Sequence, residues 1–192
     1  MRRRALLAVP VFMAALAACG GSADSPVTPP QTPSSPTGGA FTLTSPAASD
    51  GGTLPAEYTC DGAGASIALS WSNVPSGTRE FALMMTTLPG DGTTKWNWVL
   101  YAIPASATGL ARNSSGVGPP GVGTDGPQAA YQPPCSQGPG AKLYTFTLYA
   151  LSASPQLTVP ASQVTGAVLT SAISTITLGS ASLRLSYARP LS

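Results

Sequence analysis

At 192 residues the chain is long enough for one ordinary domain with its own core, plus a tail. Its 21 glycines and 20 prolines, with 43% hydrophobic and 8% charged residues, favour a turn-rich, mostly β protein over a helical bundle. The formal charge is +2, and it becomes −1 if Arg2, Arg3 and Arg4 are removed with an N-terminal leader. The rest of the chain therefore has no excess of positive charge of the kind that binds nucleic acids. The chain contains no histidine, which removes the commonest metal ligand and the usual general base near neutral pH.

The first 19 residues are typical of a bacterial lipoprotein leader. Three arginines precede the apolar run Ala5 to Leu16, which is too short to span a bilayer. The run ends in Leu16-Ala17-Ala18-Cys19, which resembles the lipobox, the motif in which the cysteine is diacylated and becomes the first residue of the mature protein. We therefore predict that residues 1–18 are a signal peptide and that Cys19 is the lipid anchor. The alternative is ordinary secretion with cleavage near Ala18.

Residues 19–39 are predicted to be a tether between the lipid and the folded part. Gly20 to Gly39 is rich in Pro, Ser, Thr and Gly and has almost no large apolar side chain, so it cannot bury enough surface to fold. The expected location is the cell envelope, facing the periplasm. Gly20 supplies no inner-membrane retention acid, which favours the outer membrane if the source has two membranes.

Residues 40–192 are predicted to form one mostly β domain. Apolar and polar residues alternate with period two in several short segments, while strand-helix alternation is absent, which favours an antiparallel sheet. The passage 105–141 is rich in Gly and Pro and has hardly any periodicity, so it is either functional or contains strands that the pattern does not reveal. The expected strands are 41–44, 67–72, 80–87, 95–104, 144–151 and 181–188, and the one expected helix is 162–176.

The segment KWNWVLYAIP, residues 95–104, is an aromatic-rich strand with a single amide between two indoles. Trp96 and Trp98 are two positions apart, so regular alternation places them on one face of the sheet and Asn97 on the other. We expect both indoles in the core, which leaves Asn97 to point toward a pocket or solvent; an aromatic platform for a ligand is the alternative.

The order of several segments resembles the bacterial branch of the phosphatidylethanolamine-binding protein family, also called Raf-kinase-inhibitor-like proteins. The similarity runs from Phe41 to Arg189, and it implies a central antiparallel sheet with a smaller flanking sheet and one or two C-terminal helices. The matching pieces are FTLTSPAASDGGTLPAEYTCDG, LSWSNVPSGTREFALMM, WNWVLYAIPA, PPC, YTFTLYAL and LRLSYAR.

The resemblance also implies a small anion pocket, which in the family is lined by an Asp-Pro-Asp loop and two histidines. In this chain the loop positions fall on Thr87, Leu88 and Pro89, the strand histidine on Asn97, and a His-Arg-Tyr sequence on Lys142-Leu143-Tyr144. The register between residues 88 and 94 leaves Asp91 as an alternative to Pro89. The predicted pocket is therefore degenerate; its lining is Thr87, Pro89, Asn97, Lys142 and Tyr144.

These replacements change what the pocket can bind. Asn97 offers one acceptor and two donors, and Lys142 offers a fixed positive charge, so a small anion or a phospholipid head group is the expected ligand. An ordinary solvated side chain is the alternative role for Lys142. The sequence contains no GxSxG or SxxK motif and no CxxC pair, so we predict no enzyme activity, no cofactor and no metal.

Cys60 and Cys135 form an even pair in an exported protein once Cys19 is lipidated, and the resemblance puts both in loops at the rim of the pocket. We expect a disulfide between them; two free, buried thiols are the alternative. Asp61, in the sequence Cys-Asp-Gly, is expected to stabilise a turn, with lining of the pocket as the other option.

The function predicted from these features is that of a non-catalytic, membrane-tethered binding protein. A protein-interaction module that inhibits or regulates a protease- or kinase-like partner is the alternative. A third possibility is that only the fold is maintained.

Overall fold

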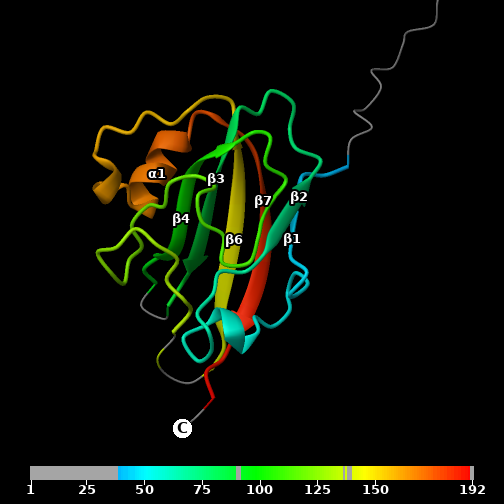
Figure 1. Cartoon of the computed structure of the whole chain (residues 1–192), viewed down its shortest axis with the longest axis vertical. Helices are drawn as coiled ribbons and strands as arrows, with labels where there is room; N and C mark the ends of the chain where they lie inside the picture. Colours follow the sequence, from blue (N-terminus) through cyan, green and yellow to red (C-terminus); the bar gives the residue numbers. More distant parts are fainter. Residues whose placement is uncertain (1–38, 90–91, 136, 138–139, 191–192) are drawn as a thin grey trace, which may run out of the picture. The chain divides into compact units, whose positions relative to one another are not determined.

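The computed structural model describes residues 39–89, 92–135, 137 and 140–190. The predicted signal peptide, the Cys19 anchor, the tether up to residue 38 and Asp91 lie outside the described residues. Two antiparallel sheets and one α-helix make up the described part (Figure 1), which confirms the mostly β architecture expected from the sequence.

The larger sheet has four strands in the order β4-β3-β6-β7. Two of them, β3 (Glu80–Thr87) and β4 (Lys95–Pro104), have the predicted bounds. The other two begin earlier than predicted, β6 at Lys142 (Lys142–Leu151) and β7 at Thr177 (Thr177–Tyr187). Along β6 and the second half of β7, side chains alternate between the core and the outer face, as expected for strands buried on one side.

The smaller sheet has three strands in the order β1-β2-β5: β1 (Thr42–Thr44), β2 (Leu69–Ser72) and β5 (Gly109–Leu110). The sequence did not predict β5 or the short 3-10 helix η1 (Ala56–Tyr58). The main hydrophobic core takes side chains from both sheets. Trp71 on β2 and Phe81 on β3 are in contact, with ring centroids 5.4 Å apart, so the two sheets are held together by burial of large apolar side chains.

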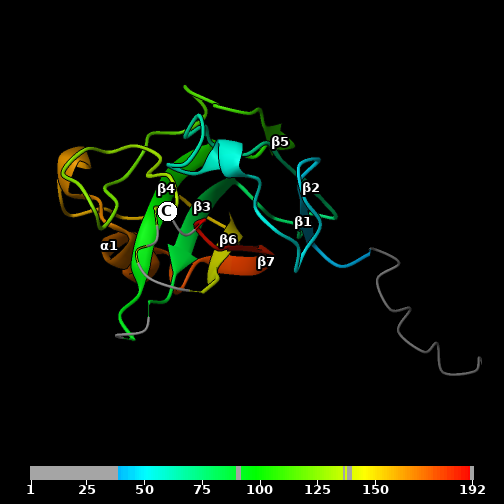
Figure 2. The ribbon, with the colours of Figure 1, turned by 90° about the horizontal axis from the view of Figure 1, so that it is seen from below.

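The helix is shorter than predicted. A 3-10 turn, η2 (Ala161–Gln163), comes first, and α1 spans only Gly166–Ile173. The reason is a cap: the Thr165 side chain accepts a hydrogen bond from the Val168 N–H at 3.3 Å, which fixes the first turn after Val164. The helix packs on the face of the large sheet opposite the small sheet (Figure 2). Among the described residues, no helix has the length and apolarity needed to cross a membrane.

The prediction that both tryptophans share one face is wrong. Met85 on β3 is opposite Trp98, whereas the next residue, Thr86, is opposite Trp96, so Asn97 is an extra residue in β4 and forms a β-bulge. The bulge resets the alternation. Trp96 packs in the cluster under α1, and Trp98 belongs to the core between the sheets.

Part of the aperiodic passage, residues 119–132, lies against the free edge of β4. Four backbone hydrogen bonds join it to that strand. They run from Tyr101 N to Pro119 O (3.3 Å), Gly121 N to Val99 O (2.8 Å), Thr124 N to Trp96 O (2.9 Å) and Gln132 N to Asn97 O (2.7 Å). The passage therefore covers an edge that would otherwise expose unpaired backbone groups.

Gly166, the first residue of α1, supplies a test of this packing. A Cβ atom at Gly166 would collide with the indole of Trp96. Gly166→Ala is therefore expected to destabilise the protein by about 1–3 kcal/mol, the usual cost of overpacking, as measured by denaturant unfolding.

Helix propensity alone predicts the opposite sign, because replacing glycine by alanine within a helix normally stabilises by up to about 1 kcal/mol. Replacing the clashing indole by a smaller side chain should relieve the collision. Gly166→Ala should therefore cost less stability in a Trp96→Leu background than in the wild type. A Gly166→Ala protein as stable as the wild type would contradict the described contact.

Candidate functional site: a cavity at the end of strands β3, β4 and β6

The residues predicted to form a pocket all line one cavity of about 360 Å3, a volume within the usual range for small-molecule sites. They come together because the strands end side by side: Thr87, the last residue of β3, is opposite Lys95 on β4 and Tyr144 on β6. Thr87, Pro89, Asn97, Lys142 and Tyr144 are the five predicted residues in the lining. That a ligand binds there remains a prediction.

The lining also contains Cys135, which the family resemblance placed at the rim of the pocket, and five residues that the sequence did not reveal: Lys95, Asp125, Gln132, Pro133 and Gln137. Lys95 had a signal, because it lies two positions before Asn97 on the same strand. Asp125 and Gln132 belong to the aperiodic passage, in which no pattern indicates which residues face β4. They are placed by the backbone bonds to the edge of that strand.

The charges in the cavity are unequal. Lys95 Nζ lies 2.9 Å from Asp125 Oδ1, so these two side chains form an ion pair. Lys142 is half-buried and, within the residues that the structure describes, has no carboxylate within ion-pair distance. The charged side chains of the described lining therefore leave one positive charge, that of Lys142.

Asn97 is hydrogen-bonded to the covering passage although it lies at a bulge. The residue is only 5% exposed, its Nδ2 donates to the Gln132 carbonyl at 3.4 Å, and its backbone carbonyl accepts from the Gln132 N–H at 2.7 Å. The Asn97 Oδ1 atom is buried and has no hydrogen-bond partner among the described residues. An unpaired buried acceptor costs about 1–3 kcal/mol, which other contacts of the fold must offset.

The disulfide prediction is confirmed. Cys60 and Cys135 are joined, with their Cα atoms 5.3 Å apart. The bond links the loop after η1 to the cavity wall, and the Cys60 N–H adds a hydrogen bond to the Pro134 carbonyl at 3.1 Å.

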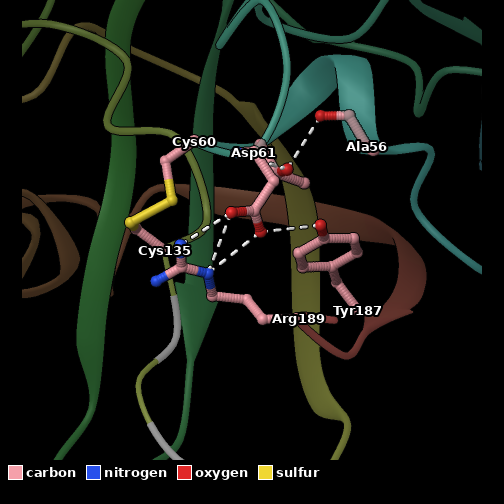
Figure 3. A network of polar contacts seen from close by, with 7 residues as sticks. Ala56, Cys60, Asp61, Cys135, Tyr187 and Arg189 are labelled. Carbon is pink, nitrogen blue, oxygen red and sulfur yellow. Dashed lines mark hydrogen bonds and ion pairs between the residues drawn. A yellow bond between two sulfur atoms is a disulfide. The ribbon is translucent and has the colours of Figure 1, made fainter. Parts of the chain in front are cut away.

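Asp61 has a different role from the one predicted (Figure 3). Its carboxylate accepts hydrogen bonds from Arg189 Nη2 at 2.7 Å and from the Tyr187 hydroxyl at 2.8 Å, and it does not line the cavity. The turn is made instead by Thr59, whose hydroxyl accepts from the Asp61 N–H at 3.2 Å and donates to the Ala56 carbonyl at 2.8 Å. Asp61 thus ties the end of the domain to the disulfide loop.

The described residues contain no group of three or more His, Cys, Asp or Glu side chains placed to hold a metal ion. Cys135, the one cysteine in the cavity wall, is occupied by the disulfide. The Thr87 hydroxyl donates to the Leu143 carbonyl at 2.8 Å. What the described lining offers a ligand is therefore a lysine, amide groups and a buried tyrosine.

Loss of the disulfide should destabilise the domain without changing its secondary structure. The bond closes a loop between residues separated by 75 positions, for which the chain-entropy relation gives about 4 kcal/mol. Denaturant unfolding of the Cys60→Ser/Cys135→Ser protein, compared with the oxidised wild type, measures this difference. Equal stabilities would show that the bond is not formed in solution.

The Asp61 ion pair predicts a loss of stability in acid. The Arg189 guanidinium, and next the Tyr187 hydroxyl, hold the pKa of Asp61 below its ordinary value of 3.8. Because the folded state holds this proton less tightly than the unfolded state, the stabilisation is complete well above pH 3.8 and is lost as the pH falls below 3.8 through the folded pKa. Asp61→Asn should therefore lower the thermal midpoint at pH 7 more than at pH 2.5.

Glu57→Gln is a control for the Asp61 variant, because the Glu57 carboxylate lies 3.7 Å from Arg112 in an exposed pair that should contribute little. Circular dichroism melts of both variants over this pH range are the measurement. An equal loss in Asp61→Asn at both pH values would contradict the assignment.

Comparison with known proteins places this chain in a family. The sequence model for phosphatidylethanolamine-binding proteins matches residues 44–188. A Mycobacterium tuberculosis protein named "Putative lipoprotein LppC" is 32% identical over 157 residues, which cover 76% of this chain and 78% of that protein. The UPF0098 protein Mb1945c of Mycobacterium bovis is 35% identical over 162 residues, covering 79% and 77%.

Two solved structures share the fold. The Chlamydia trachomatis protein CT736, a homologue of phosphatidylethanolamine-binding proteins, superposes with a TM-score of 0.72 at 27% identity, covering 79% of this chain and 99% of that one. The Escherichia coli protein YbcL superposes with a TM-score of 0.70 at 24% identity, covering 78% and 99%, and supports the fold alone. The chain therefore belongs to the phosphatidylethanolamine-binding protein family.

Proposed function

We propose that this protein is a non-catalytic binding protein, exported and tethered to an envelope membrane through Cys19, that holds a small anion in the cavity at the end of β3, β4 and β6. The leader sequence and the name of the LppC relative support the tether. Family membership supports a binding role, because members of this family generally bind phospholipids or anions and are not enzymes. The outer membrane is the favoured site of attachment if the source has two.

The observation that carries the proposal is the position of Lys142. It lines the cavity together with the Asn97 amide and the buried Tyr144, and it has no carboxylate partner among the described residues. Lys95, the other lysine, is already paired with Asp125. Lys142 is thus available as the counter-charge for an anion, and a hydrogen bond to a charged group is worth about 1.5–3 kcal/mol.

The lining also argues against catalysis. The chain has no histidine, and in the described lining the one cysteine is in a disulfide and the one threonine hydroxyl is hydrogen-bonded to a backbone carbonyl. Among its described residues the cavity therefore has groups that can hold an anion, but no activated nucleophile and no imidazole that would transform it.

The tether limits where a ligand can come from. Twenty residues of fully extended chain reach about 70 Å at most, and a flexible chain of that length has a root-mean-square span of about 25 Å. The domain would therefore stay close to the membrane surface, where phospholipid head groups are the most concentrated phosphate. A head group and free inorganic phosphate share the chemistry that Lys142 would recognise.

Removing the Lys142 charge should weaken anion binding. Lys142→Ala is expected to raise the dissociation constants for inorganic phosphate and phosphoethanolamine about tenfold to a hundredfold, measured by isothermal titration calorimetry. Tighter binding of phosphoethanolamine than of phosphate by the wild type would favour a lipid head group.

Arg79→Ala is the matched control for Lys142→Ala. Arg79 is exposed and precedes β3, at the end of that strand opposite Thr87, so its loss removes a positive charge far from the cavity and should leave both dissociation constants unchanged. If the wild type bound neither ligand, the cavity would not be an anion site. Capture of partners from envelope extracts would then test the alternative of a protein-interaction module.

A further inference from the structure

A second cavity, of about 460 Å3, is lined by residues next in sequence to those of the first. The two cavities share no lining residue, but neighbouring residues of the same two segments line them: Asn97 and Gln132 line the first cavity, and Trp98 and Tyr131 line the second. The Asn97 bulge and the backbone bond from Gln132 N to Asn97 O therefore form part of a common partition.

The second cavity has no charge in its described lining. Its polar side chains are Ser66, Asn113, Ser114, Ser115 and the two aromatic residues, and the others are glycine or apolar. Burial also raises the pKa of Tyr131, which keeps the phenol neutral, and the Tyr131 hydroxyl donates to the Tyr58 carbonyl at 2.7 Å. An ionic ligand would find no counter-charge among these residues, in contrast to the lysine-bearing first cavity.

Two polar side chains in this lining are deeply buried yet unpaired. Ser66 and Trp98 are each 3% exposed, and within the described part of the chain neither the Ser66 hydroxyl nor the Trp98 indole N–H makes a hydrogen bond. Buried hydroxyl and indole groups nearly always have a partner. A ligand in the cavity could supply the missing hydrogen-bond partners of the Ser66 hydroxyl and the Trp98 indole N–H.

These two groups remain reachable from the cavity. Among the described residues, the side-chain atoms that are both fully enclosed and unpaired are Glu80 Oε1 and Asn97 Oδ1. The Ser66 hydroxyl and the Trp98 N–H therefore keep some accessible surface, and both residues line the cavity.

The aromatic pair fixes the shape of this site. The rings of Trp98 and Tyr131 meet edge to face, with centroids 5.3 Å apart and an angle of 84° between their planes. On another side, the Asn113 N–H donates to the Ser66 carbonyl at 3.0 Å, which holds the serine-rich loop against Ser66. The lining thus combines an aromatic pair with hydroxyl and amide side chains.

We propose that this second cavity binds a small uncharged molecule that carries several hydroxyl groups and is of monosaccharide size. Serine hydroxyls and an asparagine amide both donate and accept hydrogen bonds, as the hydroxyls of such a ligand do, and the indole N–H adds one donor. The absence of charge in the described lining selects against anions. This site does not depend on whether the first cavity binds an anion.

The test is to titrate glucose, N-acetylglucosamine or glycerol into the full-length protein in detergent. Binding is measured by isothermal titration calorimetry and by saturation-transfer difference NMR. At least one of the two sugars should bind more tightly than glycerol. Ser66→Ala should raise the dissociation constant of that sugar about tenfold, because it removes a buried hydrogen-bonding group. Ala130→Trp, which adds bulk at an exposed position of the lining, should abolish sugar binding.

Ser180→Ala is the matched control, because Ser180 is an exposed serine on β7 outside the lining, and its sugar affinity should equal that of the wild type. Thermal melts show which variants are folded. If Ser66→Ala does not fold, Ala130→Trp still tests the proposal, because Ala130 is exposed and its replacement should leave the fold intact. Failure of both sugars to bind, or equal affinities in Ser66→Ala, Ala130→Trp and Ser180→Ala, would overturn the proposal. Phosphate binding by Ser66→Ala is measured in parallel. It should equal that of the wild type, because Ser66 does not line the first cavity, so a loss of sugar binding alone concerns only the second cavity.

Discussion

The hydrogen bond from Gln132 N to Asn97 O is the contact on which the rest of the site depends. β4 is the edge strand of the large sheet, and the irregular passage that follows it covers that edge through backbone bonds. At the bulge, this pairing brings Asn97 and Gln132 to one cavity and Trp98 and Tyr131 to the other. The bulge and the segment paired with it therefore contribute residues to two chemically different cavities.

The bulge also organises the core. It sends Trp96 to the helix side of the large sheet, where the indole occupies the space that a side chain at position 166 would need. It sends Trp98 to the opposite side, between the sheets. The glycine at the start of α1 is thus explained by packing against a tryptophan from β4, since helix propensity alone would favour alanine.

Some element bounds could be predicted from the sequence and others could not, for physical reasons that differ between elements. The bounds of β3 and β4 were predictable because their ends are marked by turn residues and their apolar runs are of strand length. The helix was overextended at its start because the apolar pattern includes Val164, whereas the Thr165 cap determines where the helix begins. The face of Trp96 was mispredicted because nothing in the side-chain pattern marks the extra residue at Asn97.

The five predicted residues of the first cavity meet because they lie at the ends of adjacent strands, and Lys95 was within reach of the same argument. Asp125 and Gln132 were not, because backbone contacts place them. A crystal structure of the protein soaked with phosphate tests most directly whether Lys142 provides the counter-charge of an anion site. Phosphate within hydrogen-bond distance of Lys142 Nζ is the expected result, whereas phosphate bound only elsewhere would contradict this role of Lys142.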